Sequence, residues 1–256
     1  MSVMLRLLLA HMLGDFVVQP LVLVAMKRKG WRGIIIHSAI VTAFTAALAW
    51  GQFPHWWAWT LLLGLSHAFI EHFRTFYVKD GDRRGLYYFL LDQAAHLGVI
   101  VFIAAVSVHW RPVELASLSN GTASVESQLM FYLIALIFLV WSVPILEAEM
   151  VATLIGCNED IVGGKSVRIR SVDRLLGALE RLAAVSLVLA GCFYLAPTSF
   201  LLRFYAQRGQ WRGQPSRNRL ITKMATSFLV AMATGLVLRA VPLSDPLQAI
   251  RQALQV

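Results

Sequence analysis

Long apolar segments separated by short polar ones form the main pattern along the chain. A helix needs about 20 predominantly apolar residues to cross the hydrocarbon core of a membrane. Segments of about that length cover residues 1–24, 33–50, 57–78, 86–108, 129–155 and 220–241, and a less regular apolar stretch covers 175–195. The pattern therefore predicts an all-α fold, a polytopic transmembrane helical bundle of about six to seven spans.

The composition agrees with this prediction. Of the 256 residues, 58% are hydrophobic and only 14% are charged, whereas ordinary soluble domains carry about 25% charged residues. A soluble globular protein is therefore excluded. The net charge of +9 does not indicate nucleic-acid binding, because the lysines and arginines cluster between the apolar segments, as they do in cytoplasmic loops of membrane proteins.

Basic connections alternate with connections of little charge. Those after the first, third and fifth spans are basic, and those after the second and fourth are neutral or nearly so. The basic residues are Lys27, Arg28, Lys29 and Arg32, then Arg74, Lys79, Arg83 and Arg84, then Lys165, Arg168 and Arg170. Since basic loops stay in the cytoplasm, this alternation predicts an extracytoplasmic N-terminus.

A polar extracytoplasmic loop over residues 113–127 divides the chain. Residues 1–112 are predicted to form a four-helix transmembrane bundle. Residues 128–256 are predicted to form a second membrane half, with a kinked helix at Pro144 and a C-terminal span. Glu147 follows this kink near the predicted end of a span, where we expect it to be solvated.

The stretch over 175–195 does not fit the charge alternation if it crosses the membrane once. Six basic residues follow it closely, at positions from Arg203 to Lys223, and they would lie on the wrong side. A re-entrant helical hairpin that turns near Ala196 and Pro197 would restore the pattern, provided that protein buries it.

Ionisable residues recur inside the predicted spans of the first half. Three spans each carry a histidine and a carboxylate four residues apart, and one carries a lone histidine. These residues are His11 with Asp15, His67 with Glu71, Asp92 with His96, and His37. Residues four apart share one helix face, and at ~1.5 Å of rise per residue all these groups can converge in the cytoplasmic half of the bundle.

Imidazoles and carboxylates together suit a divalent metal, either one ion or two. A metal-bound water would be ionised near neutral pH and could attack a carbonyl or phosphoryl centre. Two other interpretations remain open. Chains of Asp, Glu and His also form proton or ion pathways, and buried His–Asp hydrogen bonds can simply hold helices together.

The spacing of these residues resembles a bacterial family of integral membrane proteins classed only as a domain of unknown function. The matching motifs are His11-x3-Asp15 with Gln19 and Lys27, His37, His67-x3-Glu71, and Phe89-Leu90-Leu91-Asp92-Gln93-x2-His96, with a weaker continuation at Gly177-x2-Glu180-Arg181, Ser199-Phe200 and Arg203-Phe204. Members usually have Asp followed closely by Lys where this chain has Glu71 and His72. The resemblance implies a location in the bacterial inner membrane. A looser similarity to membrane-bound, metal-dependent hydrolases favours hydrolysis by analogy.

We therefore expect an inner-membrane protein with an intramembrane divalent-metal site, Zn first, with Mn or Fe as alternatives. The favoured function is a metal-dependent hydrolase that acts on a membrane lipid or a lipid-linked substrate from the cytoplasmic leaflet. The expected metal ligands are His11, Asp15, His67, Asp92 and His96, the expected catalytic residues are Glu71 and His37, and the expected substrate-binding residues are Gln19, Lys27, Gln93 and Arg181. The alternatives are a metal-ion or proton carrier or channel, and a non-catalytic membrane interaction or immunity factor.

Overall fold

A computed structural model describes residues 2–77, 84–109, 116–155, 171–208 and 214–241. Helices account for nearly all of these described residues, and no strand occurs among them, which confirms the all-α prediction. They divide into two compact units. Unit 1 contains Met1–His72, Ala94–Ile137 and Val237–Val256, and unit 2 contains Phe73–Gln93 and Phe138–Leu236.

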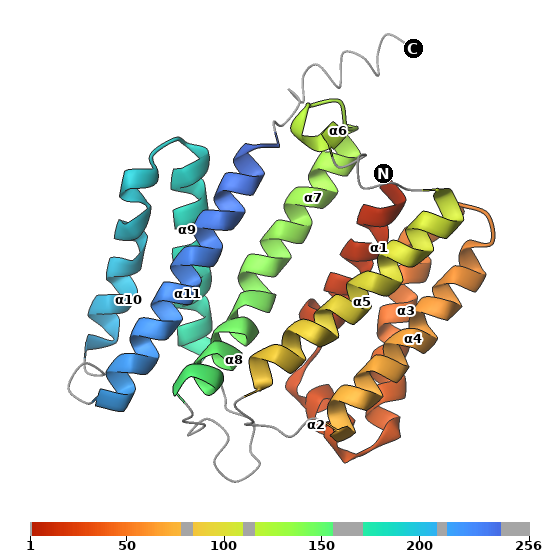
Figure 1. Cartoon of the computed structure of the whole chain (residues 1–256), viewed down its shortest axis with the longest axis horizontal. Coiled ribbons are helices and arrows are strands. Elements are labelled where there is room, and N and C mark those ends of the chain that lie inside the picture. The colour runs from red at the N-terminus through yellow and green to blue at the C-terminus, as the bar shows by residue number, and fades with distance from the viewer. Residues whose placement is uncertain (1, 78–83, 110–115, 156–170, 209–213, 242–256) are drawn as a thin grey trace. The chain divides into compact units, whose positions relative to one another are not determined.

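The helices of unit 1 run up and down in sequence, so that successive long helices are antiparallel (Figure 1). They are α1 (Ser2–Met12), α2 (Leu21–Lys29), α3 (Trp31–Ala49), α4 (Trp56–Tyr77), α5 (Gly85–Val108), α6 (Ala116–Ser119) and α7 (Val125–Ile137), with a π-helical turn, η1 (Leu13–Val17), that extends α1. The last residues of α4 and the first of α5 belong to unit 2.

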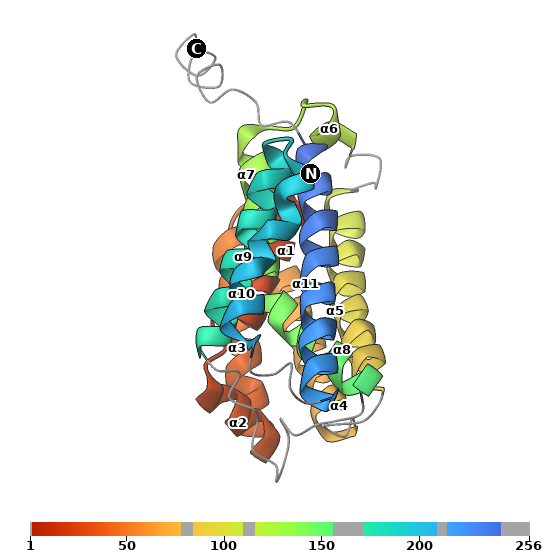
Figure 2. The same ribbon diagram turned by 90° about the vertical axis from the view of Figure 1, so that its left-hand side faces the viewer.

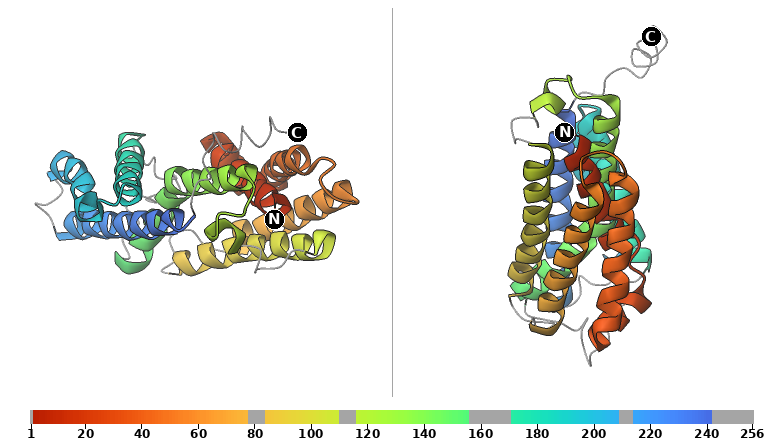
Figure 3. Two further views of the ribbon diagram at one scale, coloured as in Figure 1. Left: turned by 90° about the horizontal axis from the view of Figure 1, so that it is seen from above. Right: turned by 90° about the vertical axis from the view of Figure 1, so that its right-hand side faces the viewer.

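The core of unit 1 lies between α1, α3, α4 and α5, which Figure 3 shows from two further directions. The core residues are Val3, Leu7, Val41, Ala49, Phe53, Leu63, Ile100 and Ile103. They recur at helical spacing, for example Val3 with Leu7, so each helix presents one apolar stripe to its neighbours. This packing brings together the helices that carry the sequence motifs.

The chain bends sharply between the first two helices. The segment Val3–Val17 and the segment Val22–Lys29 meet at 90°. Pro20 occupies the cap position of α2, where its missing N–H costs nothing. Gly30 then separates α2 from α3 with a φ of 149°, which residues with a side chain rarely adopt. Two closely spaced breaks thus fold α2 back against α3.

Unit 2 contains a helical hairpin. Its elements are a π-helical turn, η3 (Phe138–Ser142), then α8 (Val143–Ile155), α9 (Ser171–Leu189), a 3-10 helix, η5 (Phe193–Phe200), α10 (Leu201–Ala206) and α11 (Gln214–Arg239). The arm formed by η5 and α10 packs back on α9 (Figure 2). The turn lies at Gly191 (φ 81°) rather than near Ala196 and Pro197, because a glycine in the left-handed conformation ends α9 first. Pro197 lies inside η5.

The predicted disturbance at Pro144 takes the form of η3, the π-helical turn that precedes it. A proline inside a helix removes one backbone hydrogen bond, and a wider turn accommodates the loss. Together α7, η3 and α8 form a continuous helical stretch over Val125–Ile155.

Within the described residues, four helical segments are long and apolar enough to cross a membrane, namely Trp31–Ala49, Gly85–Val108, Val125–Ile155 and Ser216–Arg239, and the bent pair at the N-terminus would make five. This composition suits a multi-pass membrane protein. The expected total was higher because it counted α4 and α9, whose buried charged residues lower their hydropathy. The basic segment containing Lys165, Arg168 and Arg170, and residues 113–115 of the polar loop, lie outside the described residues.

Candidate metal centre

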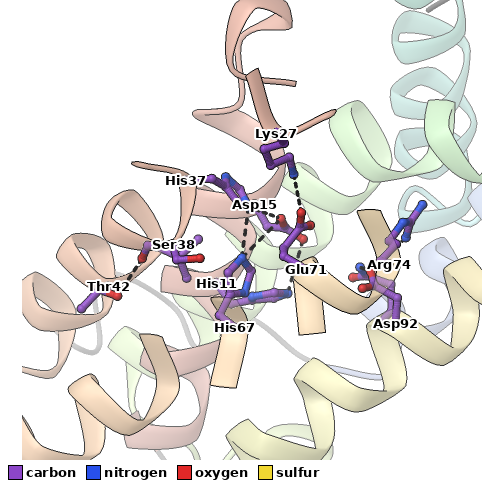
Figure 4. Close-up of polar contacts among 12 residues, drawn as sticks. His11, Asp15, Lys27, His37, Ser38, Thr42, His67, Glu71, Arg74 and Asp92 are labelled. Atoms are coloured by element: carbon purple, nitrogen blue, oxygen red, sulfur yellow. Dashed lines mark hydrogen bonds and ion pairs between the residues drawn. The ribbon is translucent and has the colours of Figure 1, made fainter. Parts of the chain in front are cut away.

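Six of the predicted site residues meet inside unit 1, and Figure 4 shows five of them, His11, Asp15, His37, His67 and Glu71. Four helices and the η1 turn supply them: His11 from α1, Asp15 from η1, His37 from α3, His67 and Glu71 from α4, and His96 from α5. All six side chains are buried. Most of the convergence predicted from the sequence is therefore present.

The η1 turn places Asp15 next to α3. An extra residue per turn shifts the backbone locally, and such π-helical turns occur often at functional sites. A β-carbon on Gly14 would lie 2.8 Å from the Cα atom of Val41, so only glycine allows α3 to come this close. As a result His37, one turn before Val41, reaches Asp15.

Asp15 lies at the middle of a chain of short polar contacts. His37 Nε2 is 3.0 Å from Asp15 Oδ1 and 3.1 Å from His67 Nε2. A carboxylate can only accept, so His37 Nε2 carries the proton and donates it to Asp15. With His37 Nε2 as the donor, His67 Nε2 can only be the acceptor of its contact with His37, so in this tautomer its lone pair points at His37.

Three of the histidines form a first candidate group for a metal, His11, His67 and His96, with ligand atoms that all lie within 4.8 Å of one another. Their rings pack closely, with 4.3 Å between the centroids of His67 and His96 and 4.8 Å between those of His11 and His96. His11 Nε2 is buried and forms no hydrogen bond within the described part of the chain. Its contact with Asp15 Oδ2, at 3.8 Å, is too long for one.

These separations fit a shared cation. Nitrogen and oxygen atoms bound to one zinc ion at ~2 Å lie roughly 3–4 Å apart. The contacts of Asp15 with His11 and His67, which are not hydrogen bonds, are 3.8 and 4.0 Å. A buried nitrogen without a hydrogen bond is costly unless another partner completes it. The donor set therefore suits a divalent metal such as zinc.

A second candidate group consists of Asp15, His37, His67 and Glu71, again with ligand atoms within 4.8 Å of one another. The two groups share His67. In the second group Lys27 Nζ lies 2.8 Å from Glu71 Oε2, and both side chains are buried. With its amide group oriented to suit both neighbours, Gln19 accepts from Lys27 Nζ and donates to the backbone carbonyl of Asp15.

The buried charges of this region do not balance. The buried side chains of unit 1 include two carboxylates, Asp15 and Glu71, and one ammonium group, Lys27. With neutral histidines one negative charge is left over, and an uncompensated buried charge is strongly unfavourable. Either a bound cation or a proton on one of the histidines would neutralise it.

Other predicted site residues lie elsewhere. Asp92 is in neither group, because its carboxylate forms an ion pair with Arg74 at 2.9 Å and accepts a hydrogen bond from Gln93. Both residues are in unit 2, and their site roles stay predictions. Arg181 is fully buried in unit 2 and donates to Glu147 Oε1 at 2.6 Å. Its predicted substrate role is likewise untested.

The network around Arg181 was largely missed from the sequence. Glu147 is buried rather than solvated, since Ser227 and Arg181 both donate to its Oε1 atom. Arg181 Nε also donates to the carbonyl of Leu139 in the η3 turn. Arg203 lies 3.4 Å from Glu147 and 3.6 Å from Glu180. The signal available was the weaker part of the family resemblance, which contains Glu180, Arg181 and Arg203 but not Glu147.

Comparison with known proteins gives one match. Residues 3–124 match the model of a family described as "Protein of unknown function (DUF3307)", which confirms the resemblance to a domain of unknown function. The matched range contains all six residues of the cluster. Searches of the curated proteins and of the solved structures found no match.

Proposed function

We propose that this chain is a membrane-embedded, metal-dependent hydrolase, and that His11, His67 and His96 hold its divalent metal. The observation that carries the proposal is the meeting of three buried imidazoles from three helices, two of which, His11 and His67, have a buried ring nitrogen without a hydrogen bond in the described part of the chain. The leftover negative charge beside them supports a cation at the same place.

A set of three histidines is typical of catalytic zinc sites, because it leaves one coordination position open. When bound, the metal would supply a polarised water near neutral pH or would polarise a carbonyl or phosphoryl oxygen. The apolar helices around the cluster favour a substrate that reaches it from the membrane, namely a lipid or a lipid-linked molecule.

The remaining polar residues would orient ligands and move protons. Asp15 accepts from His37 Nε2 and lies between His37, His67 and His11. A hydrogen-bonded partner fixes the orientation of a metal-binding histidine, so His37, held by Asp15 and 3.1 Å from His67, would orient the His67 ring. Asp15 with His37 would accept the proton of the attacking water, as a hydrogen-bonded carboxylate and imidazole do in other hydrolases. Glu71, whose carboxylate lies 2.8 Å from Lys27 Nζ, is the second candidate for this role.

A carrier of metal ions or protons is the second candidate function. The contacts from Asp15 through His37 to His67 form the kind of hydrogen-bonded relay that such proteins use. Flux of zinc or protons through the purified chain in proteoliposomes, without turnover of lipid, would favour the carrier over the hydrolase.

The test of the hydrolase combines metal content with turnover. The chain would be purified without chelators and incubated with vesicles of phosphatidylethanolamine and phosphatidylglycerol, with lipid products identified by mass spectrometry. We expect product formation that depends on added zinc and is lost in His96→Ala. As a matched control, Gln52→Ala changes an exposed polar residue outside the cluster and should leave turnover unchanged. A metal-free chain with a folded structure would contradict the proposal.

A further inference from the structure

The second candidate group offers a complete ligand set beside the first. If His67 serves the first ion, Asp15, His37 and Glu71 remain, all buried and from three different elements. Asp15 lies between the two groups, with Oδ2 toward His11 and Oδ1 toward His37. Two-metal centres in helical bundles use this kind of ligand set, in which carboxylates and imidazoles surround a bridging carboxylate.

A positive charge already occupies this group. The ammonium group of Lys27 lies 2.8 Å from Glu71 Oε2, and the side chain is only 8% exposed. Lysine is rarely buried, because removing an ammonium group from water is costly unless anions and hydrogen-bond acceptors replace the water. Glu71 and Gln19 supply these replacements. Figure 4 shows Lys27 reaching toward Glu71, away from His11 and His67.

The close packing of α2 on α3 and the bend before α2 place Lys27 at this position. A β-carbon on Gly33 would overlap the backbone of Met26 and Lys27, so α2 packs on α3 more closely than any other residue would allow. The bend at Pro20 turns α2 by 90° relative to the N-terminal segment. The neighbouring cations Arg28 and Lys29 remain exposed on the same helix. The burial of Lys27 is therefore specific to this position.

We propose that Lys27 is a built-in cation that limits the centre to one metal ion. Its ammonium group takes the charge position of a second divalent cation, which Asp15, His37 and Glu71 would otherwise bind. A second ion entering this group would meet a fixed positive charge, and like charges at contact distance in a buried site repel strongly. Lys27 thereby determines the nuclearity of the centre. This inference rests on the proposed metal at His11, His67 and His96.

The test counts zinc ions per chain in detergent-solubilised protein by elemental analysis after equilibration with zinc and removal of free metal. Wild-type protein is expected to hold one ion and Lys27→Met two, since methionine keeps much of the side chain's length without its charge. Lys27→Arg, which keeps the charge, and Lys29→Met, a control on the exposed face of α2, are expected to hold one. Lys27→Met combined with Glu71→Gln should return to one.

The possible outcomes separate the inference from the proposed function. One ion in both wild-type protein and Lys27→Met would overturn the role of Lys27 and leave the first site intact. Two ions in wild-type protein would also overturn it. No ion in folded wild-type protein would overturn the proposed function itself. If Lys27→Met does not fold, Lys27→Gln, which keeps a polar end for Gln19, carries the same expectation of two ions.

Discussion

His67 contacts four other residues of the site. Its ring packs on His96 and His11, and its Nε2 atom lies 3.1 Å from His37 and 4.0 Å from Asp15. A residue shared by both candidate groups should matter more for metal binding than a residue that only orients a metal ligand. The two kinds of contribution differ in size and can be separated by substitution.

We predict that His67→Ala abolishes stoichiometric zinc binding, whereas His37→Asn weakens it by about 10–100-fold, the usual effect of losing a partner that orients a metal ligand. Competition with a chromophoric chelator measures both affinities. Equal losses in the two variants would place His37 among the direct ligands and contradict the arrangement proposed for the first ion.

Arg181 and Glu147 form a buried ion pair in unit 2, with side chains 1% and 5% exposed. Removing Glu147 takes the carboxylate away from Arg181, and removing Arg181 leaves Glu147 only its longer contact with Arg203, at 3.4 Å. Loss of one partner of a buried ion pair typically costs about 3–5 kcal/mol. We predict that Glu147→Gln and Arg181→Met each lower thermal stability strongly. The double change Arg181→Met with Glu147→Leu should be less destabilising than the sum of the two single changes.

The pair between Arg6 and Glu126 serves as the control for this prediction, because its carboxylate is 53% exposed. Exposed ion pairs contribute about 0–1 kcal/mol, so Glu126→Gln should change the unfolding temperature little. A similar drop in both cases would mean that burial does not set the cost in unit 2.

At the residue scale the sequence predicted the cluster but not its pairings. Spacing of four along a helix placed His11 beside Asp15 and His67 near Glu71, because helical geometry is local. It could not show that Arg74 takes the carboxylate of Asp92, or that Lys27, which was expected to bind substrate, pairs with Glu71. Those contacts depend on the approach of separate helices, which no local pattern determines.

Close helix packing at the element scale depends on a few glycines. A β-carbon on Gly14 would lie 2.8 Å from two atoms of Val41. Gly14→Ala should therefore push the η1 turn away from α3 at a cost of about 1–3 kcal/mol and should weaken zinc binding through Asp15. Thermal unfolding and zinc titration measure the two effects.

Gly98→Ala provides the matched control on α5, since nothing lies within 4 Å of a β-carbon added there. Alanine favours helix over glycine by up to ~1 kcal/mol, so this variant should be neutral or more stable. If Gly14→Ala behaves like Gly98→Ala, the close approach of η1 and α3 is not essential to the site.

Helix positions were predictable because apolar length and polar breaks are properties of the sequence alone. The predicted span over 33–50 corresponds to α3 (Trp31–Ala49), and that over 86–108 to α5 (Gly85–Val108). The first predicted span was less accurate. It is broken into α1, η1 and α2, since the apolar pattern continues through Pro20 while the backbone does not. The hairpin turn at Gly191 was misplaced for a similar reason, because proline was taken as the stronger break.

The charge distribution of the whole molecule predicts its orientation in the membrane. With basic loops in the cytoplasm, Lys29 should face the cytoplasm and Ser119 the outside. In a background with Cys157 and Cys192 replaced by serine, we predict that Ser119→Cys reacts with a membrane-impermeant maleimide in intact cells. Lys29→Cys should react only after permeabilisation. Both positions are exposed on the protein surface. The opposite labelling pattern would reverse the orientation.

The central claim is that the histidine cluster of unit 1 binds a metal, and the most direct test is the metal content of the purified chain. The protein should be prepared without chelators, shown to be folded and analysed for zinc, manganese and iron next to His67→Ala. The account predicts one divalent metal ion per wild-type chain and none in the variant. Folded wild-type protein that contains no stoichiometric metal and binds none on titration would contradict it, and would leave the cluster as a hydrogen-bonded network that holds the helices together.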